Sequence, residues 1–138
     1  MRHLPRIFSP SLLAALVLAG VGATAHAEEL STSTGAQLFQ RYCASCHGKG
    51  GEGDGPVAPF FKLLPPDLTL MSRRSGGKFP AERARSIIDG RERVLPHGAR
   101  EMAVWGLEFM LATDKPAAAR SAAETIAKLV EHLRSIQK

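Results

Sequence analysis

Cys43-Ala44-Ser45-Cys46-His47 is the most informative stretch of this 138-residue chain. Its C-x-x-C-H spacing is the attachment signature of haem c, in which two thiols add across the haem vinyl groups and the adjacent imidazole binds the iron. On a helix, positions i, i+3 and i+4 share one face, so Cys43, Cys46 and His47 can all reach the same porphyrin. The motif therefore predicts one haem c, covalently held by Cys43 and Cys46, with His47 as an iron ligand.

Three other uses of such a cysteine pair fit this sequence less well. A thioredoxin-like C-x-x-C belongs at a strand-to-helix junction, and no strand pattern surrounds this one. A structural zinc site needs a second ligand pair at short spacing, whereas the chain has only two cysteines and no H-x₃₋₅-H. A disulfide between the two cysteines would close a tight, strained loop. Haem attachment remains the interpretation.

The N-terminus is typical of an exported protein. A short basic region is followed by an apolar stretch from Leu12 to Val21 and by an A-x-A cleavage pattern at 25–27. We expect residues 1–27 to be a cleaved secretory signal peptide and residues 28–138 to form one domain. The apolar stretch is short for a membrane span, so membrane attachment is expected only if this segment stays uncleaved. Bacterial haem c attachment takes place outside the cytoplasm, and a periplasmic location is therefore predicted.

The charge balance argues against nucleic acid as a partner. Arg2 and Arg6 leave with the signal peptide, so the 18 basic residues fall to 16 against 13 acidic ones, a net charge of +3. Two ionised haem propionates would lower this to about +1. The expected partners are redox proteins, bound transiently or within a subunit complex.

The first half of the mature chain predicts a helix followed by a long loop. Residues 28–33 are a polar lead-in that we expect to be mobile. Thr34 and Gln37 fit a capping box, which predicts a helix that carries the cysteines and ends soon after His47. Residues 48–69 are rich in glycine and proline without a period, so we expect an ordered loop that lies on the haem.

The second half predicts three further helical segments. One runs from Pro80 to Asp89 with Gly90 as its stop signal, and a short one covers about 103–112. The last begins at Pro116 and carries an apolar stripe. No segment alternates with period two, so the predicted fold is all-α.

The second axial ligand of the iron decides the function. Methionine gives a closed site suited to electron transfer, whereas an open face allows oxygen, peroxide or carbon monoxide chemistry. Met102 is favoured by its position, 55 residues after His47 in an irregular segment. Met71 remains an alternative after a proline-rich loop, whereas Met110 is interpreted as helix packing. The donors considered in the mature chain are Met71, Met102, Met110, His97 and His132.

Six segments together resemble the bacterial class I monohaem cytochromes c, and they cover essentially the whole mature chain. The resemblance implies a class I cytochrome c fold, with three to five helices wrapped around one covalently attached haem in residues 28–138. It implies a one-electron carrier that is not an enzyme. The segments are Cys43–His47, GEGDGP at 51–56, PDLT at 66–69, GGKFP at 76–80, IDGR at 88–91 and HGAREMAVWG at 97–106.

The resemblance also implies roles for single residues. The methionine of the family's R-x-M-P-V-W-G segment is the distal iron ligand, which corresponds to Met102. The family's next residue is a proline, and Ala103 in its place would loosen this ligand loop. Pro56 belongs to a glycine-proline pair in which a backbone carbonyl accepts the N–H of the proximal imidazole. Trp105 is expected to pack on the haem with its N–H near a propionate.

Two histidines and one helix crossing complete these expectations. Gly35 and Phe39 resemble the family's first helix, which crosses the last helix at a small residue. His132 stands near an aromatic partner position of that last helix and is interpreted as a packing residue. His97 could bond a propionate, replace Met102 or face water.

The sequence thus predicts a periplasmic one-electron carrier with His47/Met102 ligation. One alternative is a dedicated haem subunit of a periplasmic oxidoreductase, which a large exposed apolar patch near the haem edge would favour. The other is a five-coordinate haem with a peroxidase or gas-sensing role, for which Arg100 and His97 would supply distal polarity.

Overall fold

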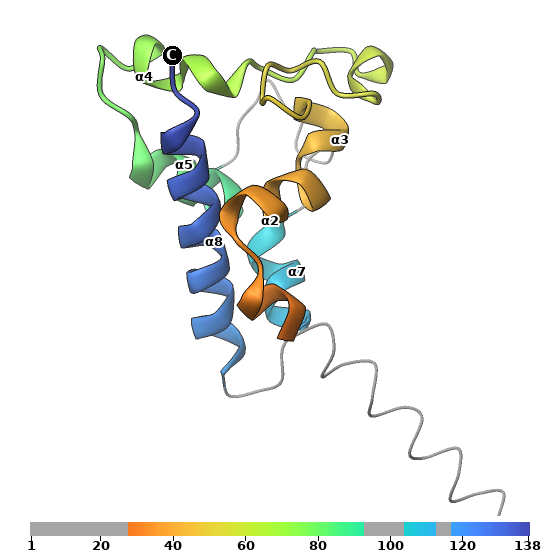
Figure 1. Ribbon diagram of the computed structural model, residues 1–138, viewed down its shortest axis with the longest axis vertical. Coiled ribbons are helices and arrows are strands. Elements are labelled where there is room, and N and C mark those ends of the chain that lie inside the picture. Colours follow the sequence, from red (N-terminus) through yellow and green to blue (C-terminus); the bar gives the residue numbers. More distant parts are fainter. Residues whose placement is uncertain (1–27, 93–103, 113–116) are drawn as a thin grey trace, which may run out of the picture.

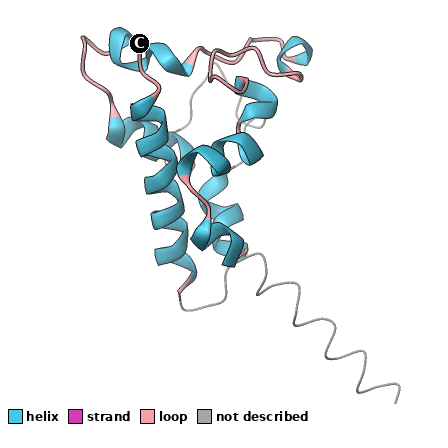
Figure 2. Ribbon diagram, in the orientation of Figure 1, coloured by secondary structure: helices cyan, strands magenta, loops and turns pink. Residues whose placement is uncertain are grey.

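The computed structural model describes residues 28–92, 104–112 and 117–138, and all regular structure among them is helical (Figure 2). The predicted all-α class is confirmed. Residues 28–32 are also helical. The elements are α2 Gly35–Tyr42, α3 Ala44–His47, the 3₁₀ turns η1 Ala58–Phe60 and η2 Leu68–Leu70, then α4 Met71–Arg74, α5 Ala81–Ile88, α7 Trp105–Leu111 and α8 Ala118–Ser135.

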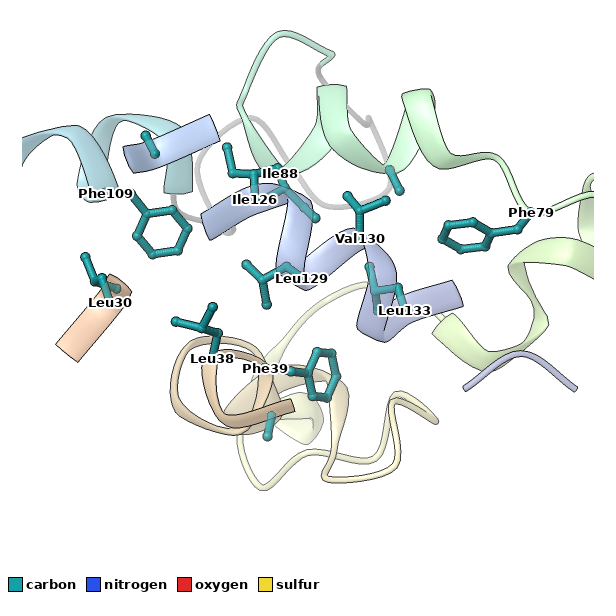
Figure 3. Close-up of a cluster of buried hydrophobic side chains, with 13 residues drawn as sticks. Leu30, Leu38, Phe39, Phe79, Ile88, Phe109, Ile126, Leu129, Val130 and Leu133 are labelled. Atoms are coloured by element: carbon teal, nitrogen blue, oxygen red, sulfur yellow. The ribbon is translucent and has the colours of Figure 1, made fainter. Parts of the chain in front are cut away.

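Helix α8 is the centre of the fold, and α2, α5 and α7 all pack against it (Figure 1). Its apolar stripe was predicted, and it forms one buried face with helical spacing. Figure 3 shows Leu129 and Leu133 of this face between Phe39 of α2 and Ile88 of α5. The buried stripe consists of Ala122, Ile126, Leu129, Val130 and Leu133.

The predicted capping box begins α2. The N–H of Gln37 donates to Thr34 Oγ1 at 3.3 Å, and the Thr34 N–H donates to Gln37 Oε1 at 2.8 Å. One residue into the helix, Gly35 lies so close to α8 that a Cβ there would stand 2.1 Å from the Lys128 carbonyl oxygen. The expectation of a small residue at this helix crossing is confirmed.

The expectation of a mobile lead-in at residues 28–33 is wrong. Residues 28–32 form a helical turn, and Leu30 is buried in the core. Lys128 of α8 donates from Nζ to the carbonyl oxygens of Ser31 at 2.6 Å and Ser33 at 3.1 Å. These long-range bonds satisfy carbonyls that the short turn leaves without helical partners.

The end of α5 meets the start of α7. Gly90 has a φ of 78°, which suits its predicted role as a helix stop, and a Cβ there would lie 2.4 Å from Val104 Cγ1. A Cβ on Gly106 would lie 2.2 Å from Asp89 Oδ1. These close approaches bring together the two chain segments on either side of residues 93–103.

The C-terminus holds the segment of η2 and α4. Gln137 donates from Nε2 to the Leu68 carbonyl at 2.9 Å and accepts at Oε1 from the Ser72 N–H at 2.8 Å. The N–H of Lys138 donates to the Thr69 carbonyl at 2.9 Å. None of the helices in the described ranges has the length and apolarity to cross a membrane. The predicted signal peptide and Pro116 lie outside the described residues.

Candidate haem-binding site

The haem motif sits on a helix that bends at its first cysteine. The structure ends α2 at Tyr42 and begins α3 at Ala44, with Cys43 between them at φ −117°. The N–H groups of Cys46 and His47 donate to the Cys43 carbonyl at 3.2 and 2.9 Å. The helical spacing is therefore kept across the bend, and the two thiols and the imidazole project from one turn.

The loop after the motif folds back onto α3. The N–H of Gly53 donates to the His47 carbonyl at 2.8 Å, that of Gly55 to Cys46 at 3.2 Å, and that of Val57 to Ser45 at 3.1 Å. A Cβ on Gly55 would stand 2.4 Å from the Ser45 carbonyl oxygen, so only glycine fits at this distance. The loop thereby satisfies the last carbonyls of α3 and fixes the backbone of the predicted ligand His47.

A cavity of about 310 Å³ opens beside the motif. Cys43 and His47 line it, and His47 is only 7 % exposed. Most of its wall comes from apolar side chains of α2, α5, α8 and the η2–α4 segment. These are Phe39, Pro66, Leu68, Met71, Pro80, Ala84, Ile87, Ile88, Leu129 and Leu133.

The remaining lining residues are polar: Arg74, Ser75 and Arg83. Arg74 donates from Nη2 to the Asp67 carbonyl oxygen at 2.6 Å, whereas the Asp67 carboxylate accepts from Thr69. Arg83 forms an ion pair with Glu92 at 3.0 Å. The direct bond of Arg74 is thus to a neutral carbonyl. The pKa of the Asp67 carboxyl is lowered mainly by its hydrogen bond from Thr69, with a smaller contribution from the Arg74 charge.

This combination of side chains fits haem c. The apolar wall suits the macrocycle, the Cys43 thiol suits a vinyl group, and the imidazole suits the iron. Cys46, predicted to hold the second vinyl group, does not line the cavity. Two arginines suit the propionates, because guanidinium groups bind carboxylates with a matching fork of donors. None of the described residues that line the cavity is acidic. Among the described residues there is also no cluster of three or more histidine, cysteine or acidic side chains able to hold a bare metal ion.

The environment of Cys43 bears on the thioredoxin-like alternative. Cys43 and Cys46 are free rather than joined in a disulfide. Burial, with a smaller contribution from the neighbouring Cys46, raises the pKa of the Cys43 thiol to about 12. A reactive thiol depends on a lowered pKa, so the raised pKa does not favour Cys43 as the attacking thiol of a thioredoxin-like site.

The distal ligand predicted from the sequence cannot be placed. Met102, Ala103 and His97 lie outside the described residues. Met71, the alternative sulfur donor predicted from the sequence, lines the cavity from α4. Met110 was expected to pack in the interior but is 42 % exposed, because Phe109 turns to the core instead.

The other predicted cofactor contacts stay predictions. Trp105 packs in an aromatic cluster, with its ring centroid 5.2 Å from Tyr42 and 5.9 Å from Phe109. Trp105 does not line the described cavity. Its ring contact is with Tyr42, the residue directly before Cys43. Pro56 is exposed, and the bonds of its segment to α3 come from Gly55 and Val57.

His132 packs as predicted. Its ring lies 5.1 Å from that of Phe39, with the two planes at 53°. Burial lowers the pKa of the imidazole, which favours the neutral form. Since Phe39 also lines the cavity, this contact connects the helix crossing to the haem pocket.

Sequence reasoning missed Arg74 and Arg83 as cavity residues. Cations in a loop or on a short helix are usually solvated. A usable signal was the pairing of cations with the apolar positions Met71 and Ile87 on the same elements, one helical turn away.

Comparison with known proteins gives one match. The family model described as "Cytochrome C oxidase, cbb3-type, subunit III" matches residues 31–133, which include the motif, the cavity and most of α8. No curated protein and no solved structure matches the chain.

Proposed function

Because the chain belongs to the family of the cbb3-type cytochrome c oxidase subunit III, and is thus a monohaem c-type cytochrome, we propose that it is a periplasmic one-electron carrier. A bound haem supplies the one-electron iron couple. The residues of this chain attach it, exclude water from it and hold its charge. No described residue is assigned to the transformation of a substrate.

One observation carries the proposal: the motif and the apolar cavity lie together. Cys43 and His47 line the cavity from one turn of helix. Its wall comes largely from the packed helices α2, α5 and α8, whose contacts hold the surroundings of a bound iron in place. A rigid site suits electron transfer, because the surroundings of the iron then change little between oxidation states.

Met102 is proposed as the second axial ligand. The support is its place in the segment that resembles the family's R-x-M-P-V-W-G, together with the contact between Gly90 and Val104 on either side of residues 93–103. That contact holds together the two residues that flank the proposed ligand loop. Ala103 in place of proline makes this loop less constrained, and the methionine sulfur remains the expected iron ligand.

The periplasmic location is proposed from the leader sequence and from the need for two free thiols during haem attachment. Mass spectrometry of the secreted protein tests both points. A chain that begins at Glu28 and carries the mass of one haem would support them. The Cys46→Ala variant should keep at most one thioether bond, whereas Ser45→Ala should keep both.

Potentiometric titration tests electron transfer itself. The haem-loaded protein should titrate reversibly with one electron and should not accelerate peroxide turnover. Irreversible reduction, or peroxidase activity well above that of free haem, would contradict a carrier function.

A second candidate function is a haem subunit held permanently in an oxidoreductase complex. It is favoured by exposed apolar residues in the loop that follows the motif, where Phe60 is 86 % exposed. The family description itself refers to an oxidase subunit. Purification of the secreted protein at native level distinguishes the two, because a subunit would elute with a larger partner and a carrier would elute alone.

A further inference from the structure

Residues 66–74 form one wall of the cavity beside the haem motif, to which Pro66, Leu68, Met71 and Arg74 contribute side chains. The segment consists of a short loop, the three-residue turn η2 and the four-residue helix α4. Helices this short are marginal by themselves, because few of their backbone groups find partners within the helix. The position of this wall therefore depends on bonds to the rest of the fold.

Gln137 supplies such bonds from the residues that follow α8. Its Nε2 donates to the carbonyl oxygen of Leu68 at 2.9 Å and to that of Leu133 at 2.7 Å. Its Oε1 accepts from the N–H of Ser72 at 2.8 Å. A carboxamide offers two N–H donors and one acceptor oxygen on a single planar group. One side chain thus joins η2 and α4 to the last turn of α8, which lies beside α4 in Figure 1.

The groups that Gln137 joins belong to the cavity wall. Leu68 and Leu133 line the cavity from η2 and from α8, and Nε2 bridges their two carbonyls. Ser72 directly follows the lining residue Met71. Gln137 itself does not line the described cavity. It therefore acts on the cavity through the residues that it holds.

Other main-chain bonds hold the same segment and do not involve the Gln137 side chain. The N–H of Lys138 donates to the carbonyl of Thr69 at 2.9 Å, and Thr69 is buried. The N–H of Leu68 donates to the carbonyl of Gly51 at 2.7 Å. Since these bonds remain when Gln137 is substituted, such a variant should loosen the wall without unfolding the protein.

We propose that Gln137 is a positioning residue of the haem site, which holds residues 66–74 against α8 and thereby keeps water from the haem. The proposal rests on the proposed electron-transfer function and names a residue outside the motif on which that function depends. A looser wall would let water approach the iron. Water favours the oxidised iron, which carries the extra positive charge, so the reduction potential should fall when Gln137 is lost.

The first test measures hydrogen exchange at single amides of the haem-loaded protein by NMR. Gln137→Leu keeps much of the side-chain volume and removes its hydrogen bonds without a change of charge. The Ser72 amide should then exchange at least about tenfold faster than in wild type. The amide of Leu129, in the buried part of α8, should keep its wild-type rate. An unchanged rate at Ser72, or an equal rise at Leu129, would overturn the proposal, because the second result would mean a general loss of stability.

The second test is voltammetry of the same protein with a matched control. Gln40 is an exposed glutamine of α2 whose Nε2 donates to the Lys49 carbonyl at 2.9 Å, in the loop after the motif. It does not line the described cavity. The reduction potential should fall in Gln137→Leu and stay at the wild-type value in Gln40→Leu. An unchanged potential in Gln137→Leu, or equal shifts in the two variants, would contradict a positioning role.

These measurements also separate the proposal from the function on which it rests. A wild type with a reversible haem couple, together with a Gln137→Leu variant of the same potential, overturns the positioning role and leaves the carrier function intact. A wild type without a reversible couple overturns both. If Gln137→Leu does not retain haem, Gln137→Asn replaces it, because this variant keeps the carboxamide and shortens its arm by one methylene. The same rise in exchange at Ser72 and the same fall in potential are then expected.

Discussion

The ring centroids of Phe39 in α2 and His132 in α8 lie 5.1 Å apart where the two helices cross. Gly35, one turn before Phe39, lets the helices approach this closely. Phe39 also forms part of the cavity wall beside Cys43. The packing of the N- and C-terminal helices and the shape of the proposed haem pocket therefore depend on each other.

The crossing predicts a cost for any side chain at Gly35. In Gly35→Ala the new Cβ would meet the Lys128 carbonyl, and the helices would have to separate. We expect the free energy of unfolding to fall by about 1–3 kcal/mol, as for other overpacked cores. Denaturant unfolding of the haem-loaded protein measures this change. Gly50→Ala is the control, because a Cβ there meets nothing closer than 3.7 Å, and equal midpoints for the two variants would refute the close crossing.

The His132 imidazole predicts a pH dependence of stability. Burial lowers its pKa in the folded state, so the unfolded chain binds the proton more readily. The contribution of His132 to the free energy of unfolding is fully present above the unfolded pKa of about 6.5. It is lost as the pH falls through and below that value. His132→Phe keeps a ring against Phe39 and should remove this loss. Unfolding midpoints at about pH 5 and pH 8 give the comparison, and a variant with the wild-type slope would show that His132 does not titrate in this way.

The helices were predictable where their signals are local. The Thr34–Gln37 capping box, the Gly90 stop and the stripe of α8 each depend on residues within a few turns. The turn at residues 28–32 was not predictable, because Lys128, almost a hundred residues away, holds it. The bend at Cys43 and the short α4 have no signal in the hydrophobic periodicity of the sequence.

The site was predictable only in part, for a similar reason. The motif itself identifies Cys43, Cys46 and His47, since its chemistry requires those residue types at that spacing. Arg74 and Arg83 line the cavity only because the fold brings α4 and α5 beside the motif, which no local sequence pattern shows. Phe60 in a proline-rich loop gave no sign of its exposure, because the loop has no period from which a buried face can be inferred.

The cations of the cavity predict an effect on the reduction potential. If Arg74 faces a propionate, Arg74→Gln removes a positive charge that favours the reduced iron, and the potential should fall. Voltammetry of the haem-loaded protein measures the shift. Both Arg73 and Arg74 are exposed, but only Arg74 lines the cavity, so Arg73→Gln should change the potential less. Equal shifts in the two variants would show that Arg74 acts only as surface charge.

The most direct test of the proposed carrier is its optical spectrum in both oxidation states, with and without carbon monoxide. Met102→Ala and Met71→Leu are measured beside the wild type. We predict a low-spin wild type with a sulfur-to-iron charge-transfer band and no reaction with carbon monoxide. The band should persist in Met71→Leu, whereas Met102→Ala should lose it and bind carbon monoxide. A high-spin wild type that binds carbon monoxide, or a band lost only in Met71→Leu, would contradict His47/Met102 ligation.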